Sequence, residues 1–186
     1  LAVYEPRKGH DFMIRVMQDV VAVVPEAYLL VCGDGTEEER QTVQRVRAMS
    51  PVASHVVLQS HRPDIGNVMG QVQVLVAPSQ SYESFGYTVA EAMSCALPVV
   101  VTNVGGLPEV VDDGVTGYVV SPLDAGGFAA KIVNLLQDES LRHRMGQMGR
   151  KRFEEHFLAE RMTREYVNLA DSFAQIGHDC VGCNAQ

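Results

Sequence analysis

Apolar positions follow two different periods along the chain, and the two kinds of segment alternate. Apolar residues recur every three or four positions, as in helices packed on one face, over residues 10–24, 36–49, 86–96, 124–137 and 139–155. Residues 28–32 form an unbroken apolar run of strand length, and mainly apolar segments of similar length occupy residues 56–58, 72–77, 98–102 and 117–120. Such runs are typical of strands buried on both faces of a parallel sheet. The alternation therefore predicts an α/β domain, Rossmann-like, with helices flanking a parallel sheet.

Local signals place two further helices within the pattern. Thr36 followed by three glutamates predicts a capped helix start, and a short polar helix is expected at 64–70.

The end of the pattern sets the expected domain boundary. Met162, Tyr166, Leu169 and Phe173 mark a final amphipathic helix. Residues 176–186 carry no period. We therefore expect one domain over 1–175 and a flexible tail over 176–186.

Composition narrows the classes of partner. Of the 186 residues, 46% are hydrophobic and 20% are charged, which is ordinary for a globular domain. The net charge of −8 argues against a nucleic acid partner or an anionic membrane surface. It does not argue against a small phosphate-bearing ligand, since one or two cations and free backbone N–H groups can hold a phosphate. No run approaches the roughly 20 apolar residues of a membrane span, and no leader is recognisable, so we expect a cytoplasmic location.

Cysteines and histidines give no clear metal site. Cys32 and Cys95 stand in apolar contexts and are expected to be small buried residues. Cys180 and Cys183 form half of a zinc-binding pattern, and two reduced thiols in a tail are the alternative that we favour. Of the six histidines, only His61 is expected near a ligand cleft.

The cleft itself is expected at one edge of the sheet. In an open α/β sheet, ligands bind beyond the carboxyl ends of the strands. The loops at 33–35, 79–86 and 103–106 each follow a predicted strand. We therefore expect these three loops to meet there.

The loop at 79–86 leads into a helix that begins near Tyr87. The free N–H groups of that helix, beside Gly86, suit a diphosphate. Glu91 points away from the apolar face of the helix, so its carboxylate is available to a ribose diol, and Glu83 is available to a second polyol such as a hexose. The alternative is that Glu91 is a solvated helix residue and Glu83 a loop acid, and the spacing alone does not decide between them.

Residues 78–93, PSQSYESFGYTVAEAM, carry the most specific pattern in the chain. Two glutamates eight positions apart in this setting resemble the signature of retaining glycosyltransferases of family 4 (group 1), which have the two-domain GT-B fold. Other motifs resemble the family in the same order, namely KG at 8–9, LVCGDG at 30–35, PVV and GG at 98–106 and DG at 113–114. The resemblance covers about residues 1–173 and implies the C-terminal, donor-binding half of such an enzyme.

The resemblance also implies roles for single residues. Glu83 would be the catalytic carboxylate, contacting sugar hydroxyls and placing the sugar for transfer. The backbone at Phe85, Gly86 and Tyr87 would approach the sugar and phosphate of the donor. Glu91 would bind the ribose diol.

The cationic groups complete the implied donor site. Lys8 would meet the pyrophosphate as a point charge. Arg62, with Ser60 and His61, lies where the family reads the base, although the family usually has glycine where Ser60 stands. The arginine that the family carries shortly before its lysine would precede Leu1, and the loop is expected to hold Arg7 elsewhere.

The implied donor is a nucleoside-diphosphate sugar, with no cofactor and no metal needed to bind it. The implied partner is an acceptor-binding N-terminal domain outside this sequence, and any peripheral membrane contact would run through that half. The chain alone would then be inactive. Two other functions remain open, a stand-alone nucleotide-sugar-binding module and a GT-B-fold epimerase. The two spaced glutamates after Pro78-Ser79 favour the transferase over the epimerase.

Overall fold

The computed structural model describes residues 4–182, with side chains described as far as Ser172. Two short 3-10 helices, η1 (Pro6–Lys8) and η2 (Ala53–His55), accompany the main elements. The helices are α1 (His10–Val23), α2 (Glu37–Met49), α3 (Ile65–Met69), α4 (Tyr87–Ser94), α5 (Leu107–Val110), α6 (Ala125–Gln137), α7 (Glu139–His156) and α8 (Ala159–Gly182). The strands are β1 (Leu29–Cys32), β2 (Val56–Gln59), β3 (Leu75–Ala77), β4 (Val99–Thr102) and β5 (Gly117–Val120).

All the strand pairs are parallel, as the apolar runs predict. In the described part of the chain the strands form two ladders, β1-β2 and β3-β4-β5, where the sequence predicts a single sheet. Residues of β1 and β3 line a common cavity that lies between the two ladders. Strand β4 is the centre of the larger ladder and is buried along its whole length, which explains its unbroken run of valines.

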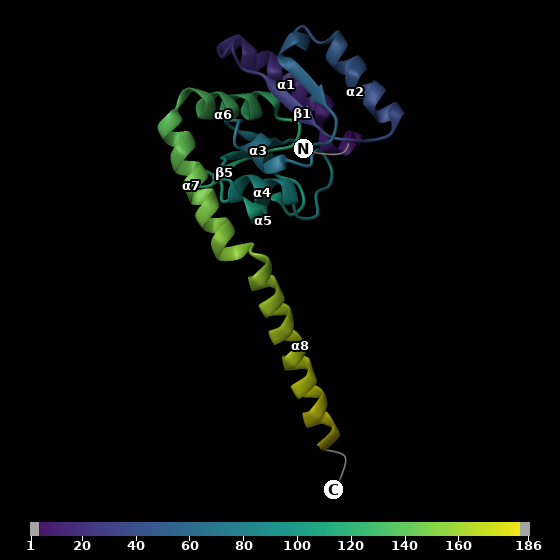
Figure 1. The fold of residues 1–186 in the computed structure, drawn as a ribbon, viewed down its shortest axis with the longest axis vertical. Helices are drawn as coiled ribbons and strands as arrows, with labels where there is room; N and C mark the ends of the chain where they lie inside the picture. The colour runs from purple at the N-terminus through teal and green to yellow at the C-terminus, as the bar shows by residue number, and fades with distance from the viewer. Residues whose placement is uncertain (1–3, 183–186) are drawn as a thin grey trace.

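Helices cover both ladders and enclose two apolar clusters. One cluster packs α1 directly against α6, with Phe12 and Phe128 edge to face, and includes residues of β1 and β4. The other joins α4 to β3, β4 and α5, with Met93 fully buried. Figure 1 shows α4 and α5 on the side of the molecule opposite α2, with α7 running along the flank. The predicted flanking of a parallel sheet by helices is confirmed.

Side-chain caps fix the starts of three helices, of which the sequence analysis predicts the one at Thr36. Thr36 accepts a hydrogen bond from Glu39 N–H while the Glu39 carboxylate accepts one from Thr36 N–H, a capping box at α2. Asp124 and Asp138 cap α6 and α7 through their carboxylates. The four-residue helix α5 was not predicted, since the glycines before it indicate only a chain break.

The last helix extends further than the sequence pattern predicts. Helix α8 continues to Gly182 and projects away from the body of the molecule (Figure 1). Its apolar side chains Met162, Tyr166 and Leu169 are exposed. Residues 183–186 and the side chains of Cys180 and Cys183 lie outside the described residues, so the zinc alternative stays a prediction. Between residues 4 and 182, no helix is both long and apolar enough to cross a membrane.

One of the two predicted buried cysteines is buried and the other is not. Cys32 is 2% exposed in β1, as predicted. Cys95 is exposed, so that prediction is wrong. Cys95 is the C-cap of α4, two positions after the buried Met93, and two positions of a helix rotate a side chain away from the packed face.

Candidate functional site

A cavity of about 330 Å³ opens between β1, β3 and the start of α4. Its walls come from five parts of the chain. They are Arg7, Lys8, His10 and Met13 near the N-terminus, Leu29–Val31 of β1, Val76–Ser79 of β3 and the residues after it, Glu83 with Gly86–Val89, and Leu107. The cavity therefore runs along β1 and reaches past the carboxyl end of β3, the kind of strand end at which a ligand site is expected in an α/β fold.

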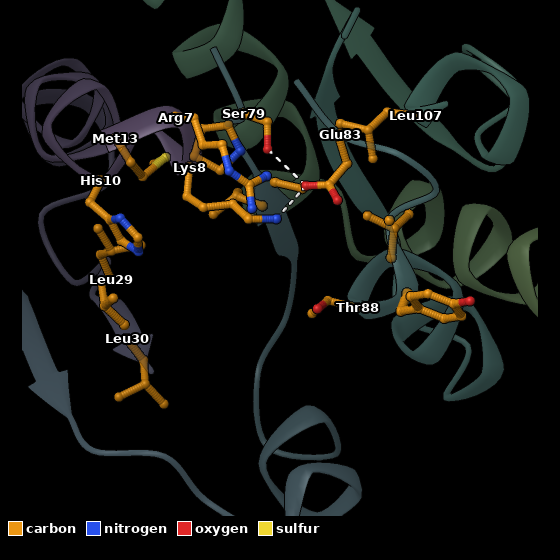
Figure 2. A pocket seen from close by; sticks show the side chains of 17 residues that line it. Arg7, Lys8, His10, Met13, Leu29, Leu30, Ser79, Glu83, Thr88 and Leu107 are labelled. Carbon is orange, nitrogen blue, oxygen red and sulfur yellow. Dashed lines mark hydrogen bonds and ion pairs between the residues drawn. The ribbon is translucent and has the colours of Figure 1, made fainter. Parts of the chain in front are cut away.

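Two opposite charges meet inside this cavity. Lys8 Nζ lies 2.5 Å from Glu83 Oε2, and the two side chains are only 17% and 14% exposed. Figure 2 shows the two side chains approaching each other, with Ser79 beside them. The Ser79 hydroxyl donates to the same carboxylate oxygen at 3.2 Å. The cation and the carboxylate are thus placed close enough to act on one ligand.

The start of α4 forms the wall next to Glu83. Gly86 is the N-cap of α4 and makes no side-chain capping bond. The first turn, from Tyr87 on, lines the cavity. The N-terminus of a helix carries partial positive charge from its N–H groups and favours an anion. Together with Lys8, it makes this side of the cavity suited to a phosphate.

Backbone hydrogen bonds join the loops after β3 and β4 and the turn that carries Lys8. Gln80 N–H donates to the Arg7 carbonyl at 2.8 Å, which ties the loop after β3 to the turn that holds Lys8. Gly106 N–H donates to the Glu83 carbonyl at 2.9 Å. A Cβ on Gly105 would lie 1.9 Å from that same carbonyl oxygen, so the loop after β4 packs directly on the backbone of Glu83.

Of the three loops that were expected to meet at this edge of the sheet, two do so. The loops 79–86 and 103–106 meet at Glu83. The turn 33–35 does not line the cavity. It packs on Tyr4 instead, whose N–H donates to the Asp34 carbonyl at 3.0 Å. The turn that precedes α1, which carries Lys8, takes its place in the cavity wall.

Four of the seven residues expected at the site line this cavity, namely Lys8, Glu83, Gly86 and Tyr87. Phe85 turns its ring onto Tyr87 and Phe157, with ring centroids 5.1 and 5.6 Å apart. Glu91 is exposed one turn along α4, as its helical position predicts, and does not line the cavity. The roles expected of Phe85 and Glu91 stay predictions.

Arg62 does not reach the cavity either. Its guanidinium donates to both carboxylate oxygens of Asp64 at 2.8 and 2.6 Å. The hydrogen bond from Arg62 lowers the pKa of the Asp64 carboxyl. Both residues are partly exposed. A base-reading role for Arg62 requires exchange of this partner and stays a prediction.

Arg7 lies at the cavity, although the loop was expected to hold it elsewhere. Its guanidinium donates to the Tyr82 carbonyl at 3.3 Å and forms an ion pair with Glu5. The side chain is 35% exposed. Arg7 therefore adds a second cation beside Lys8, at the more solvated end of the site.

His10 is the residue that sequence reasoning missed. It is 9% exposed, its ring lies 5.4 Å from the ring of Tyr4, and its Nδ1 is buried without a hydrogen-bond partner. The expectation that only His61 lies near the cleft is wrong, because His10 lines the cavity. The available signal is its position immediately after Lys8-Gly9, at the start of α1.

We expect His10 to make the fold sensitive to acid. Burial lowers the pKa of His10 from 6.5 to about 4, so the folded protein favours the neutral ring. Below pH 6.5, His10 binds a proton in the unfolded chain but stays neutral in the folded chain. The free energy of unfolding therefore falls as the pH drops toward 4. The loss attributable to His10 between about pH 7 and pH 5 is about 2 kcal/mol.

Urea unfolding of the parent and of His10→Phe at both pH values measures this contribution. The parent should lose about 2 kcal/mol more than the variant on acidification. Equal losses in the two proteins would show that another group carries the acid sensitivity.

Comparison with known proteins places this chain in a family. A profile of the glycosyl transferases group 1 family matches residues 1–152. The chain is 32% identical over 162 residues to N-acetyl-alpha-D-glucosaminyl L-malate synthase of Bacillus anthracis, covering 84% of this chain and 42% of that enzyme.

Solved structures share the fold. Anabaena HepE in complex with UDP superposes with a TM-score of 0.84 at 21% identity, over 91% of this chain and 47% of that one. The C-terminal domain of a group 1 glycosyl transferase from Francisella tularensis (LpcC) gives 0.77 at 21% identity, over 86% of this chain and 84% of that one. The chain thus spans less than half of the longer relatives. The profile match extends over more than half of the chain, and the chain belongs to the glycosyl transferases group 1 family.

Proposed function

We propose that this chain is the nucleotide-sugar-binding half of a retaining glycosyltransferase of family 4. The observation that carries the proposal is the meeting of Lys8 and Glu83 in one cavity wall, 2.5 Å apart and beside the N-terminus of α4, whose N-cap is Gly86. A cation and a helix N-terminus suit the diphosphate. A carboxylate next to them suits the hydroxyls of the attached sugar.

The same groups would serve the departure of the nucleoside diphosphate. As the bond to the sugar breaks, negative charge grows on the leaving diphosphate, and fixed positive groups nearby stabilise it. Lys8 and the first turn of α4 would supply this stabilisation. Glu83 would hold the sugar in place during transfer, and no metal is needed for donor binding in this scheme.

A direct test is calorimetric titration of the chain with UDP-, GDP- and ADP-sugars, with the free nucleoside diphosphates and with the free sugars. The proposal predicts that a sugar nucleotide and its nucleoside diphosphate bind, whereas the free sugar alone does not. A chain that binds none of the nucleotides would refute it.

Glu91 is proposed to bind the ribose diol from one turn inside α4. Since Glu91 is exposed, Glu91→Ala opens no cavity and should leave the fold intact. Loss of hydrogen bonds to a charged acceptor costs about 1.5–3 kcal/mol, so nucleoside diphosphate affinity should fall at least about tenfold. The matched control is Glu26→Ala, an exposed glutamate before the amino end of β1. Equal affinities in the two variants would remove Glu91 from the site.

The acceptor would be held by an N-terminal half of the enzyme that is not part of this sequence. The chain by itself would then bind the donor without transferring the sugar. Any membrane contact would run through that other half, and a cytoplasmic location suits a nucleotide-sugar donor.

A further inference from the structure

Glu83 is held by two donors on a single oxygen. Lys8 Nζ and the Ser79 hydroxyl both reach Oε2, at 2.5 and 3.2 Å. Figure 2 shows the other oxygen of the carboxylate turned away from both donors. A glutamate side chain loses considerable rotamer freedom when it is fixed, so these two contacts select one orientation of the carboxylate.

Ser79 is itself fixed by the fold. It is only 2% exposed, and its carbonyl accepts a hydrogen bond from the hydroxyl of Thr102, which is fully buried at the end of β4. The next residue, Gln80, is tied through its N–H to the Arg7 carbonyl at 2.8 Å. The backbone of Ser79 is therefore fixed relative to both β4 and the turn that carries Lys8, within reach of Glu83 for its hydroxyl.

A bound diphosphate would affect the two donors, Lys8 and Ser79, differently. Lys8 carries a full charge and would be drawn toward a diphosphate, which weakens its hold on Glu83. Ser79 is neutral, and its hydroxyl would keep the carboxylate in place once Lys8 has turned to the phosphate. A hydrogen bond to a charged acceptor is strong enough to do this.

We propose that Ser79 is a positioning residue that holds the Glu83 carboxylate toward the sugar of the donor. The part of this inference that concerns the sugar rests on the proposed function. Ser79→Ala should lower the affinity for a sugar nucleotide by roughly three- to tenfold and leave the affinity for the matching nucleoside diphosphate unchanged. In a Glu83→Ala background, which removes the acceptor, Ser79→Ala should cause little further loss, because the two residues act as one unit.

A second measurement needs no ligand. The carboxyl carbon resonance of Glu83 is identified in a ¹³C-glutamate-labelled protein by its disappearance in Glu83→Gln. Ser79→Ala should shift this resonance and Ser79→Thr, which keeps the hydroxyl, should restore it, while the resonance of Glu91 stays in place. Thr102→Val removes the bond that fixes Ser79 and should move the Glu83 resonance in the same direction by a smaller amount.

The two measurements separate the two claims. An unmoved Glu83 resonance in Ser79→Ala overturns the positioning role, whatever the chain binds. Equal losses for the sugar nucleotide and the nucleoside diphosphate, or full additivity with Glu83→Ala, also overturn it. A parent chain that binds no nucleotide overturns the proposed function, and the resonance then still decides whether Ser79 positions Glu83.

Discussion

The purified chain is expected to bind a nucleotide sugar and to form no glycoside from it. Transfer requires an acceptor hydroxyl held against the sugar carbon, and such positioning supplies about 7–11 kcal/mol of the barrier. In the proposed function, Lys8, Glu83 and the start of α4, which line the described cavity, would hold the diphosphate and the sugar. The cavity would therefore bind the donor alone.

Incubation of the chain with a bound sugar nucleotide and a set of glycosyl acceptors measures this directly. Released nucleoside diphosphate and new glycoside are quantified separately, because slow hydrolysis gives the first without the second. Glycoside formation with repeated turnover, abolished by Glu83→Gln, would place an acceptor site within this chain or between two copies of it.

Gly105→Ala is expected to damage both the fold and the site. Gly105 has a φ of +54°, and a Cβ on it would lie 1.9 Å from the Glu83 carbonyl oxygen. The left-handed conformation costs a non-glycine residue about 1–2 kcal/mol, and forcing apart two packed segments costs about 1–3 kcal/mol more. The backbone of Glu83 must move, so sugar nucleotide binding should fall together with stability.

Gly114→Ala separates these two causes. Gly114 has a φ of +76°, with open space around the position of a Cβ. It should lose only the conformational part, about 1–2 kcal/mol, and keep its affinity for the donor. Urea unfolding and donor titration of both variants check the prediction, and an equal loss of stability in the two would show that the Glu83 contact contributes nothing.

Much of the fold follows from local pattern. The valine runs predict β4 and β5 because strands buried on both faces need apolar side chains at every position. Thr36 and its glutamates predict the start of α2 because capping is decided within one turn. The exposure of Glu91 follows from its place on the helical wheel. The division of the sheet into two ladders has no local signal, since it depends on how β1 and β3 sit across the cavity.

The site was less predictable, because its contacts join residues far apart in the sequence. Lys8 and Glu83 are both indicated by motifs, yet their direct contact joins positions 75 apart, and no spacing rule foretells it. His10 was missed because a lone histidine at a helix start carries no signal until tertiary packing buries it. The position of Arg7 was predicted wrongly because the orientation of its side chain depends on Tyr82 and Glu5 as much as on the turn.

Titration of the tightest-binding nucleoside diphosphate into the parent, Lys8→Ala and Lys151→Ala tests the central claim most directly. Lys151 is an exposed lysine on α7 and controls for the loss of one positive charge. Lys8→Ala removes a charged donor and leaves the partly buried Glu83 carboxylate without its cationic partner beside the diphosphate, so the affinity should fall at least about tenfold. Lys151→Ala should bind as the parent does. Equal affinities in all three proteins would contradict the assignment of this cavity to the donor.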